Sequence, residues 1–238
     1  MEIALKALRR GLSIYLEKPV SHNRDGVDDL LKLGENVVVE VGCQLRAHPN
    51  LQALHALLTK RKALGERILS YRFSMGQRLD AWRPGTNYLE SYSADASRGG
   101  GALFDLIHQI DLSLWLIGPM ASVMGELSSN SDLHLKADDL AHMLVTHQDG
   151  VIGHVQVDMV APVLRCDMEI VTSQRIYRWD YRAGKLWEET PEGNVLVDET
   201  SPEFERNDLF MEILDHYMKR MDDTSIAPMC SLADGVHA

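Results

Sequence analysis

The sequence predicts the end of a doubly wound α/β domain over residues 1–46, followed by an α+β domain over residues 47–238 with a mostly antiparallel sheet. Near the N-terminus, helical and strand patterns alternate in a way that is typical of parallel α/β units. Beyond residue 120, short β-rich runs recur at hairpin-like spacing, with turn signals such as Gln148-Asp149-Gly150 between them. These two observations decide the fold class.

The first part of the chain is predicted to hold two short strands and the helices that precede them. Val37–Val41 is rich in β-branched residues and is followed by Gly42, which is typical of a buried parallel strand. The predicted elements are a helix over 3–10, a strand over 12–16, a helix over 25–34 and a strand over 37–41.

The second part is predicted to combine three helices with a sheet. The helices cover 49–63, 102–116 and 203–221, and residues 231–238 read as the opening of one more. The strands cover 67–77, 121–129, 139–147, 151–160, 166–173, 175–181, 185–189 and 195–198, with an irregular stretch over 80–98. In the 203–221 helix we expect five residues to face inward: Phe204, Leu209, Ile213, Leu214 and Tyr217.

The strands carry more apolar surface than one layer of helices covers. We expect the helices over 102–116 and 203–221 to pack on one face of the sheet and a partner subunit to cover the other, so that the protein is a homo-oligomer. The residues expected on that second face are Val123, Leu127, Met143, Val145, Val155, Val157 and Met159.

Composition and net charge indicate which partners and which cellular compartment to expect. A formal net charge of −11 argues against nucleic acid and acidic membranes as partners, because phosphate binding needs a basic surface. The three cysteines, Cys43, Cys166 and Cys230, are widely spaced and are expected to be reduced thiols in a cytoplasmic protein. The first residues lack the pattern of a signal peptide, and no apolar run is long enough to span a membrane.

Lys18 is a candidate for proton transfer. It comes just after a predicted strand, and Pro19 holds its backbone extended. The carboxyl ends of parallel strands are where open α/β sheets bind ligands, and partial burial there lowers an ammonium pKa. The alternative is a surface lysine loosely paired with Glu17.

His108 is the second candidate. On one continuous helix, Asp105 and Asp111 would lie three residues to either side of it, within reach of the imidazole. A carboxylate could then hold one ring nitrogen while the other takes a substrate proton. Gly99–Gly101 would let backbone approach a ligand closely. The alternative is a histidine in a solvated charge pair on the helix surface.

The irregular stretch and the remaining histidines are weaker candidates for functional residues. Arg83, Tyr88 and Tyr92 suit contacts to sugar hydroxyls or a phosphate, and the alternative is a structural loop. Three histidines, His142, His147 and His154, fall on two strands around a turn, but no cysteine or carboxylate accompanies them in a ligand spacing. No metal site is therefore predicted.

Four stretches taken in order resemble the glucose-fructose oxidoreductase, inositol dehydrogenase and rhizopine-catabolism (Gfo/Idh/MocA) family of NAD(P)-dependent sugar oxidoreductases. These stretches are Glu17-Lys18-Pro19, the run Val41–Pro49, the loop Trp82–Tyr92 and Gly99–Gly118. The resemblance implies that residues 1–46 are the C-terminal part of a Rossmann-type dinucleotide-binding domain, and that the rest is a domain for substrate binding and oligomerisation.

The resemblance also implies roles for single residues. Lys18 and His108 would act as acid and base across a cleft, with Asp105 as the group that orients His108. The nicotinamide of NAD or NADP would lie near Glu17, Lys18, Pro19 and Gln44, and a sugar would meet Arg83, Tyr88 and Tyr92. Two departures stand out: the acid and the histidine are three residues apart where many relatives have four, and the glycine-rich fingerprint of the nucleotide-binding half does not occur in the chain.

The function expected is hydride transfer between NAD(P) and a hydroxyl or carbonyl of a sugar or nucleotide sugar, in a chain that is truncated relative to the family. The alternative is a non-catalytic fragment or scaffold module that self-associates through its sheet.

Overall fold

The computed structural model describes residues 1–238, which form two compact units. The first unit joins Met1–His48 to Pro202–Ala238, and the second is Pro49–Ser201. A single cut near residue 46 is expected from the sequence. The difference arises because the C-terminal segment returns to the first unit, where helix α7 (Leu232–His237) contacts helix α2 and strand β2.

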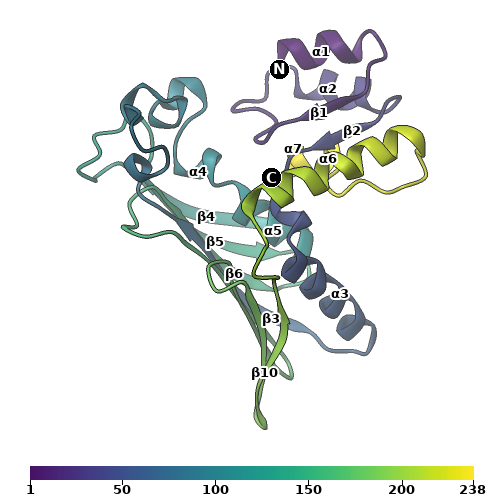
Figure 1. Ribbon diagram of the computed structural model, residues 1–238, viewed down its shortest axis with the longest axis vertical. Helices are drawn as coiled ribbons and strands as arrows, with labels where there is room; N and C mark the ends of the chain where they lie inside the picture. Colours follow the sequence, from purple (N-terminus) through teal and green to yellow (C-terminus); the bar gives the residue numbers. More distant parts are fainter. The chain divides into compact units, whose positions relative to one another are not determined.

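The first unit is built around two short parallel strands, as the sequence predicts. Its elements are α1 (Glu2–Leu8), β1 (Ile14–Leu16), α2 (Val27–Gly34), β2 (Val39–Val41), a 3-10 turn (Gln44–Ala47), α6 (Arg206–Asp222) and α7 (Figure 1). β1 pairs with β2 in parallel, with Tyr15 opposite Glu40. Leu8, Leu30, Val41 and Leu232 lie in one apolar cluster, so both ends of the chain contribute to this core.

A buried ion pair fastens the C-terminal segment to β2. Glu40 is fully buried, and its Oε2 accepts a hydrogen bond of 2.8 Å from Nη1 of Arg220 on α6. The same Nη1 donates to the Val39 carbonyl at 2.9 Å, and the Cys230 amide donates to Oε1 of Glu40 at 2.8 Å. Every polar contact of this carboxylate therefore ties β2 to residues at the other end of the sequence.

Helix α6 differs in one detail from expectation. Leu209, Ile213 and Tyr217 are buried, but Leu214 is 43% exposed, and Phe204 precedes the helix. Ile213 and Leu214 point about 100° apart on an α-helix, so the narrow buried stripe accommodates only one of them. The prediction that Leu214 faces inward is wrong.

The second unit is an eight-stranded sheet in the order β10-β9-β8-β7-β3-β6-β5-β4. Its strands are β3 (Ile68–Gly76), β4 (Met120–Ser128), β5 (Leu140–His147), β6 (Ile152–Asp158), β7 (Arg165–Thr172), β8 (Ile176–Asp180), β9 (Lys185–Thr190) and β10 (Gly193–Glu199). Only the β3–β6 pair is parallel, so the predicted mostly antiparallel sheet is confirmed. The irregular stretch between β3 and the next helix holds short 3-10 turns.

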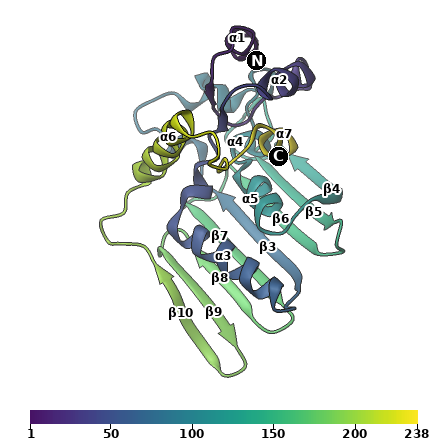
Figure 2. The same cartoon turned by 90° about the vertical axis from the view of Figure 1, so that its right-hand side faces the viewer.

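Helices cover one face of this sheet, which we call the inner face (Figure 2). α3 (Pro49–Ala63) contacts β9 and β10, α4 (Ala102–Asp105) contacts β5 and β6, and α5 (His108–Leu116) contacts β3 and β6. The largest buried side chains of the strands include Phe73, Ile170, Tyr177 and Trp179. The core of the unit lies between these helices and the sheet.

The expected distribution of apolar residues over the two faces is wrong. Met143, Val145, Val155, Val157 and Met159 are all buried, because strand alternation turns them to the same side as the core. Val123 and Leu127 are exposed on the edge strand β4, opposite Val145 and Ala141. These residues therefore give no reason of their own to expect a partner on the opposite, outer face.

The outer face is mainly polar in its middle. A row of alternating charges crosses four strands, with nitrogen–oxygen distances of 3.9 Å for Arg72–Glu169, 3.2 Å for Glu169–Arg178 and 3.0 Å for Arg178–Glu189. Exposed apolar side chains of this face gather toward the β4 edge, where Met124 lies opposite Leu144.

The predicted helix over 102–116 is broken in two. α4 ends at Asp105, Leu106 has φ −102° and ψ 28°, and α5 begins at His108. Leu106 and Ile107 are both buried, as are the residues on either side of them. One side of a straight helix packed on a sheet faces solvent, so several consecutive residues cannot all be buried. The break between α4 and α5 allows the four residues from Asp105 to His108 to be buried together.

Candidate functional site

In the first unit, the candidate residues follow the carboxyl ends of the two parallel strands. Glu17 and Lys18 come directly after β1, the Lys18–Pro19 peptide bond is cis, and Gln44 opens the 3-10 turn that follows β2. The amide of Gly42 donates to the Leu16 carbonyl at 2.8 Å, which holds the two strand ends together. The structure thus brings Lys18 and Gln44 to the same edge of this small sheet.

Gly42 marks a crowded point at this edge. A β-carbon there would lie 2.8 Å from the hydroxyl oxygen of Tyr15 and 3.3 Å from a carboxylate oxygen of Glu17. Burial, and secondarily the charge of Glu17, raise the pKa of Tyr15 above its usual range. Tyr15 is therefore a neutral phenol over the whole physiological range and does not act as a base.

In the second unit, the structure pairs Asp105 with Tyr92. The Tyr92 hydroxyl donates to Oδ1 of Asp105 at 2.6 Å, and burial followed by this hydrogen bond raises the pKa of Tyr92 to about 12. Both Asp105 and His108 are buried. Asp105 ends α4 whereas His108 begins α5, so the helical spacing that the sequence suggests for this pair is lost.

Asp111, unlike Asp105, lies on the same helix as His108. It lies three residues after His108 within α5, on the first turn of the helix, and it is also buried. Of the two carboxylates considered from the sequence, Asp111 is the one that shares a helix with the imidazole.

The glycines before α4 serve packing within the unit. A β-carbon on Gly100 would lie 2.1 Å from the Tyr92 carbonyl oxygen, and Gly101 has φ +110°. The Leu103 amide donates to Oδ2 of Asp138 at 2.8 Å, which occupies the start of α4. The close backbone approach expected of these glycines is therefore made to the 92–93 segment and to Asp138.

The three candidates for substrate contact lie in the same loop but have different neighbours. Tyr92 contacts Asp105, as described above. Tyr88 donates to the Leu133 carbonyl at 3.3 Å, and Arg83 is exposed and lowers the pKa of Tyr92 slightly through its charge. Arg83 and Tyr92 are thus close enough to interact electrostatically, while Tyr88 anchors the loop.

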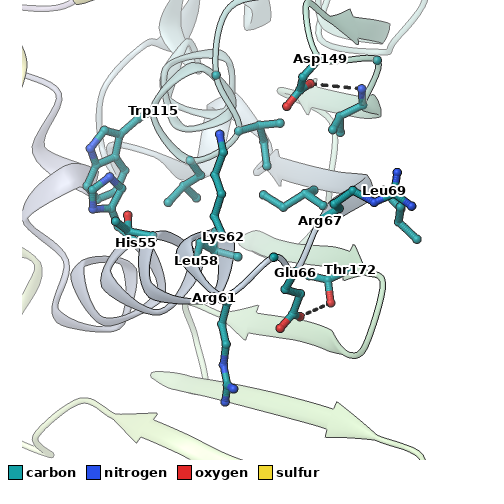
Figure 3. A pocket seen from close by; sticks show the side chains of 18 residues that line it. His55, Leu58, Arg61, Lys62, Glu66, Arg67, Leu69, Trp115, Asp149 and Thr172 are labelled. Carbon is teal, nitrogen blue, oxygen red and sulfur yellow. Dashed lines mark hydrogen bonds between the residues drawn. The ribbon is translucent and has the colours of Figure 1, made fainter.

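A cavity of about 620 Å³ lies elsewhere in the second unit, and sequence reasoning missed it (Figure 3). It is formed where α3 and α5 end and β3 begins, beside the β5–β6 turn. On one side of it, the rings of His55 and Trp115 stack with centroids 4.5 Å apart, and the Lys62 side chain extends between Trp115 and Asp149. None of the candidate residues named from the sequence lines this cavity, because its lining comes from four separate segments.

The comparison with protein families identifies the chain. Residues 51–178 match the family model described as the GFO/IDH/MocA C-terminal domain, and this match spans more than half of the sequence. The chain belongs to the Gfo/Idh/MocA family, as its motifs indicate. No curated protein matches it in sequence.

Solved structures share its fold at low sequence identity. A levoglucosan dehydrogenase in complex with NADH and levoglucosan superposes with a TM-score of 0.83 at 22% identity, over 98% of this chain and 70% of that one. An inositol dehydrogenase homolog from Azotobacter vinelandii, complexed with NADH and myo-inositol, gives 0.80 at 15% identity, over 99% and 69%. The UDP-N-acetylglucosamine 3-dehydrogenase from Acidithiobacillus ferrooxidans gives 0.78 at 18%, over 98% and 69%.

Every helix of the present chain is too short or too polar to cross a membrane.

The residues of this chain do not fit the pyrophosphate of a dinucleotide. Such a group needs a glycine-rich turn that leads into a helix N-terminus after a parallel strand. α2 is the helix that follows β1, and its first turn carries Asp28 and Asp29, whose charges repel a phosphate. No glycine-rich fingerprint occurs in the sequence.

Proposed function

We propose that this chain provides the substrate-binding and proton-transfer part of an NAD(P)-dependent oxidoreductase that acts on a hydroxyl or carbonyl of a sugar or nucleotide sugar. Membership of the Gfo/Idh/MocA family supports the class of reaction. The observation that carries the proposal furthest is the buried set around the start of α5, where an imidazole and a carboxylate share a helical turn. Buried titratable groups that lie together are candidates for proton transfer.

The proposed roles follow from the chemistry of each group. His108 and Lys18 act as acid and base at the substrate oxygen, since an imidazole and an ammonium group both exchange protons near neutral pH when partly buried. In oxidation, the base removes the hydroxyl proton, and in reduction it returns that proton to the carbonyl oxygen. Asp105 has a positioning role through Tyr92, and Asp111 supports the imidazole.

The remaining assignments concern binding. Arg83, Tyr88 and Tyr92 contact the hydroxyl or phosphate groups of the substrate. Glu17, Pro19 and Gln44 lie near the nicotinamide, by the family resemblance, and residues 1–46 are the last part of a Rossmann-type domain. Residues 47–238 would then form the domain for substrate binding and oligomerisation, with its C-terminal segment packed in the first unit.

A second candidate function is a non-catalytic module that self-associates through the outer face of its sheet. The acidic first turn of α2 favours it, because Asp28 and Asp29 repel the phosphates of a dinucleotide there. Under either function we propose a homo-oligomer. Met124, Leu144 and Ile152 are exposed by 74%, 49% and 50%, and they form an apolar area on the β4 side of this face.

Two measurements test these proposals. The protein as its native host produces it is assayed with a panel of sugars and nucleotide sugars against NAD⁺ and NADP⁺, following the nicotinamide absorbance. Turnover with one of them supports the oxidoreductase, and failure of the whole panel refutes it. Light scattering at micromolar concentration then tests self-association, and a clean monomer refutes the oligomer proposal.

A further inference from the structure

Two histidines of neighbouring strands meet on the outer face of the sheet. Nδ1 of His142 on β5 lies 3.1 Å from Nε2 of His154 on β6, and the ring centroids are 5.2 Å apart with planes tilted by 31°. In the register of the two strands, His142 is opposite Gln156 and His154 is opposite Leu144, so the histidines form a diagonal pair. Diagonal neighbours in a sheet are within reach of long side chains.

Strand alternation explains why only two of the three nearby histidines form this outer-face pair. His147 is an odd number of residues from His142, so it points to the inner face, where Nδ1 contacts the Gly118 carbonyl at 2.8 Å and Nε2 contacts the Tyr71 hydroxyl at 2.8 Å. His142 and His154 remain together on the outer face, and His142 is exposed. The sequence suggests a group of three, whereas the structure separates a buried histidine from a solvent-facing pair.

The distance between the two nitrogens is compatible with one metal ion. Imidazole nitrogens bind first-row ions such as Zn²⁺ at about 2.0–2.1 Å, so two of them at bond angles of roughly 90–109° are about 2.9–3.4 Å apart. The observed 3.1 Å lies inside that range. The same separation suits a hydrogen bond between the rings, so an ion replaces the proton that one of the two nitrogens carries in that bond.

A carboxylate is placed to serve as a third ligand. Glu126 on β4 is directly opposite His142 and is exposed on the same face. Directly opposite residues have β-carbons about 4.5–5.5 Å apart, so a change of side-chain rotamer brings the carboxylate toward the pair. Arg72, opposite His154 on β3, opposes a cation, but its guanidinium is drawn to Glu169 at 3.9 Å.

We propose that His142 and His154 form a binding site for a divalent first-row transition ion, with Glu126 as a third ligand and water in the open positions. Imidazole ligands select Zn²⁺, Ni²⁺ or Cu²⁺ over Mg²⁺ and Ca²⁺, which prefer oxygen. An ion bound there links three adjacent strands, β4, β5 and β6, and stabilises the folded chain by mass action.

The test is calorimetric titration of the tag-free protein with ZnCl₂ and with NiCl₂. We expect one equivalent to bind with micromolar affinity, no saturable heat with MgCl₂, and a rise in Tm when Zn²⁺ is added. His142→Ala and His154→Ala each remove the binding and the rise in Tm, and Glu126→Gln weakens the affinity. His22→Ala, at an exposed histidine of the other unit, leaves both unchanged.

Two results overturn the proposal. One is the absence of saturable binding of either ion to the unaltered protein. The other is an undiminished equivalent in both histidine variants, which would place the ion elsewhere, for example on the buried thiols. Circular dichroism of each variant confirms folding, and His154→Gln replaces His154→Ala if the alanine variant does not fold.

Discussion

Gly153 and Tyr71 face each other across the parallel strands β3 and β6, and Gly153 has no space for a β-carbon. A β-carbon there would lie 1.9 Å from the Tyr71 ring, which is buried. The Tyr71 hydroxyl in turn contacts Nε2 of His147, whose Nδ1 contacts the Gly118 carbonyl after α5. A glycine in one strand thus makes room for a polar chain that links the sheet to the end of a helix.

Replacing Gly153 by alanine should destabilise the second unit. The β-carbon must displace the Tyr71 ring, and overpacking of this kind costs about 1–3 kcal/mol in a well-packed core. Urea unfolding followed by circular dichroism measures the change. Ser122→Ala on the exposed edge strand is the matched control and should change the free energy of unfolding by less than about 0.5 kcal/mol. Equal stability of the two variants would contradict the tight fit.

The stability of the fold should fall in alkali partly because of Tyr71. Burial raises the pKa of Tyr71 from 10.0 to about 12, so the phenol contributes stability below pH 10 that is lost as the pH rises toward 12. Tyr71→Phe should lose about 1 kcal/mol at neutral pH with the hydrogen bond to His147. Its free energy of unfolding should then decline less than that of the unaltered protein between pH 10 and 12. Identical slopes in denaturant titrations over this window would refute the assignment.

Arg220→Ala should be the most damaging single change in the first unit. It leaves the fully buried Glu40 carboxylate without its charged partner, and breaking a buried ion pair from one side costs about 3–5 kcal/mol. The neighbouring Lys219→Ala removes an exposed pair with Asp215 and should cost far less, because exposed ion pairs contribute little to stability. Thermal unfolding of both variants side by side decides the matter, and similar Tm values would show that the buried pair contributes little.

The 238-residue chain should bind NAD(H) and NADP(H) only in the millimolar range. The start of α2 is acidic, and the glycine-rich turn needed for a pyrophosphate does not occur in the sequence. Calorimetry with each nucleotide is the measurement, and Asp28→Asn combined with Asp29→Asn shows whether those charges oppose binding. A micromolar dissociation constant for the unaltered chain would reveal a nucleotide site that these arguments miss.

Turnover should depend on Lys18 and His108 more than substrate binding does. In the protein as its native host produces it, His108→Ala and Lys18→Ala should each lower kcat by about 10²- to 10⁴-fold with little change in KM. Asp105→Ala should lower it less, because Asp105 acts through Tyr92 and Asp111 is the carboxylate that shares a helical turn with His108. Arg72→Ala, on the outer face of the sheet, is the control. Near-normal kcat in both alanine variants would end the assignment of roles.

The strands were predictable from the sequence because their alternation has a local cause. Apolar residues recur at every second position of β5, β6 and β7, and turn residues such as Asp149–Gly150 separate β5 from β6. The alternation shows which residues share the apolar face but not what covers that face, so its burial under helices of the same chain was not predictable. Helix contacts with β3, β5 and β6 decide it.

Other features of the fold could not be predicted because the residues that determine them lie far apart in the sequence. Glu40 contacts Cys230 across a separation of 190 residues, which no local pattern reveals, so the return of the C-terminal segment was missed. The break between Asp105 and His108 follows from burial on several sides at once, whereas the sequence pattern alone is compatible with one helix. The position of Lys18, Pro19 and Gln44 after strand ends was predictable, because short β-branched runs and a proline are local signals.

The contribution of both chain ends to one core has a consequence for biosynthesis. The second unit, Pro49–Ser201, is contiguous, so a ribosome has delivered all of its residues before the last segment emerges. The first unit, in contrast, waits for Arg220 and Cys230 before the Glu40 carboxylate is satisfied. During translation the segment Met1–His48 therefore lacks part of its core until Arg220 and Cys230 have emerged from the ribosome.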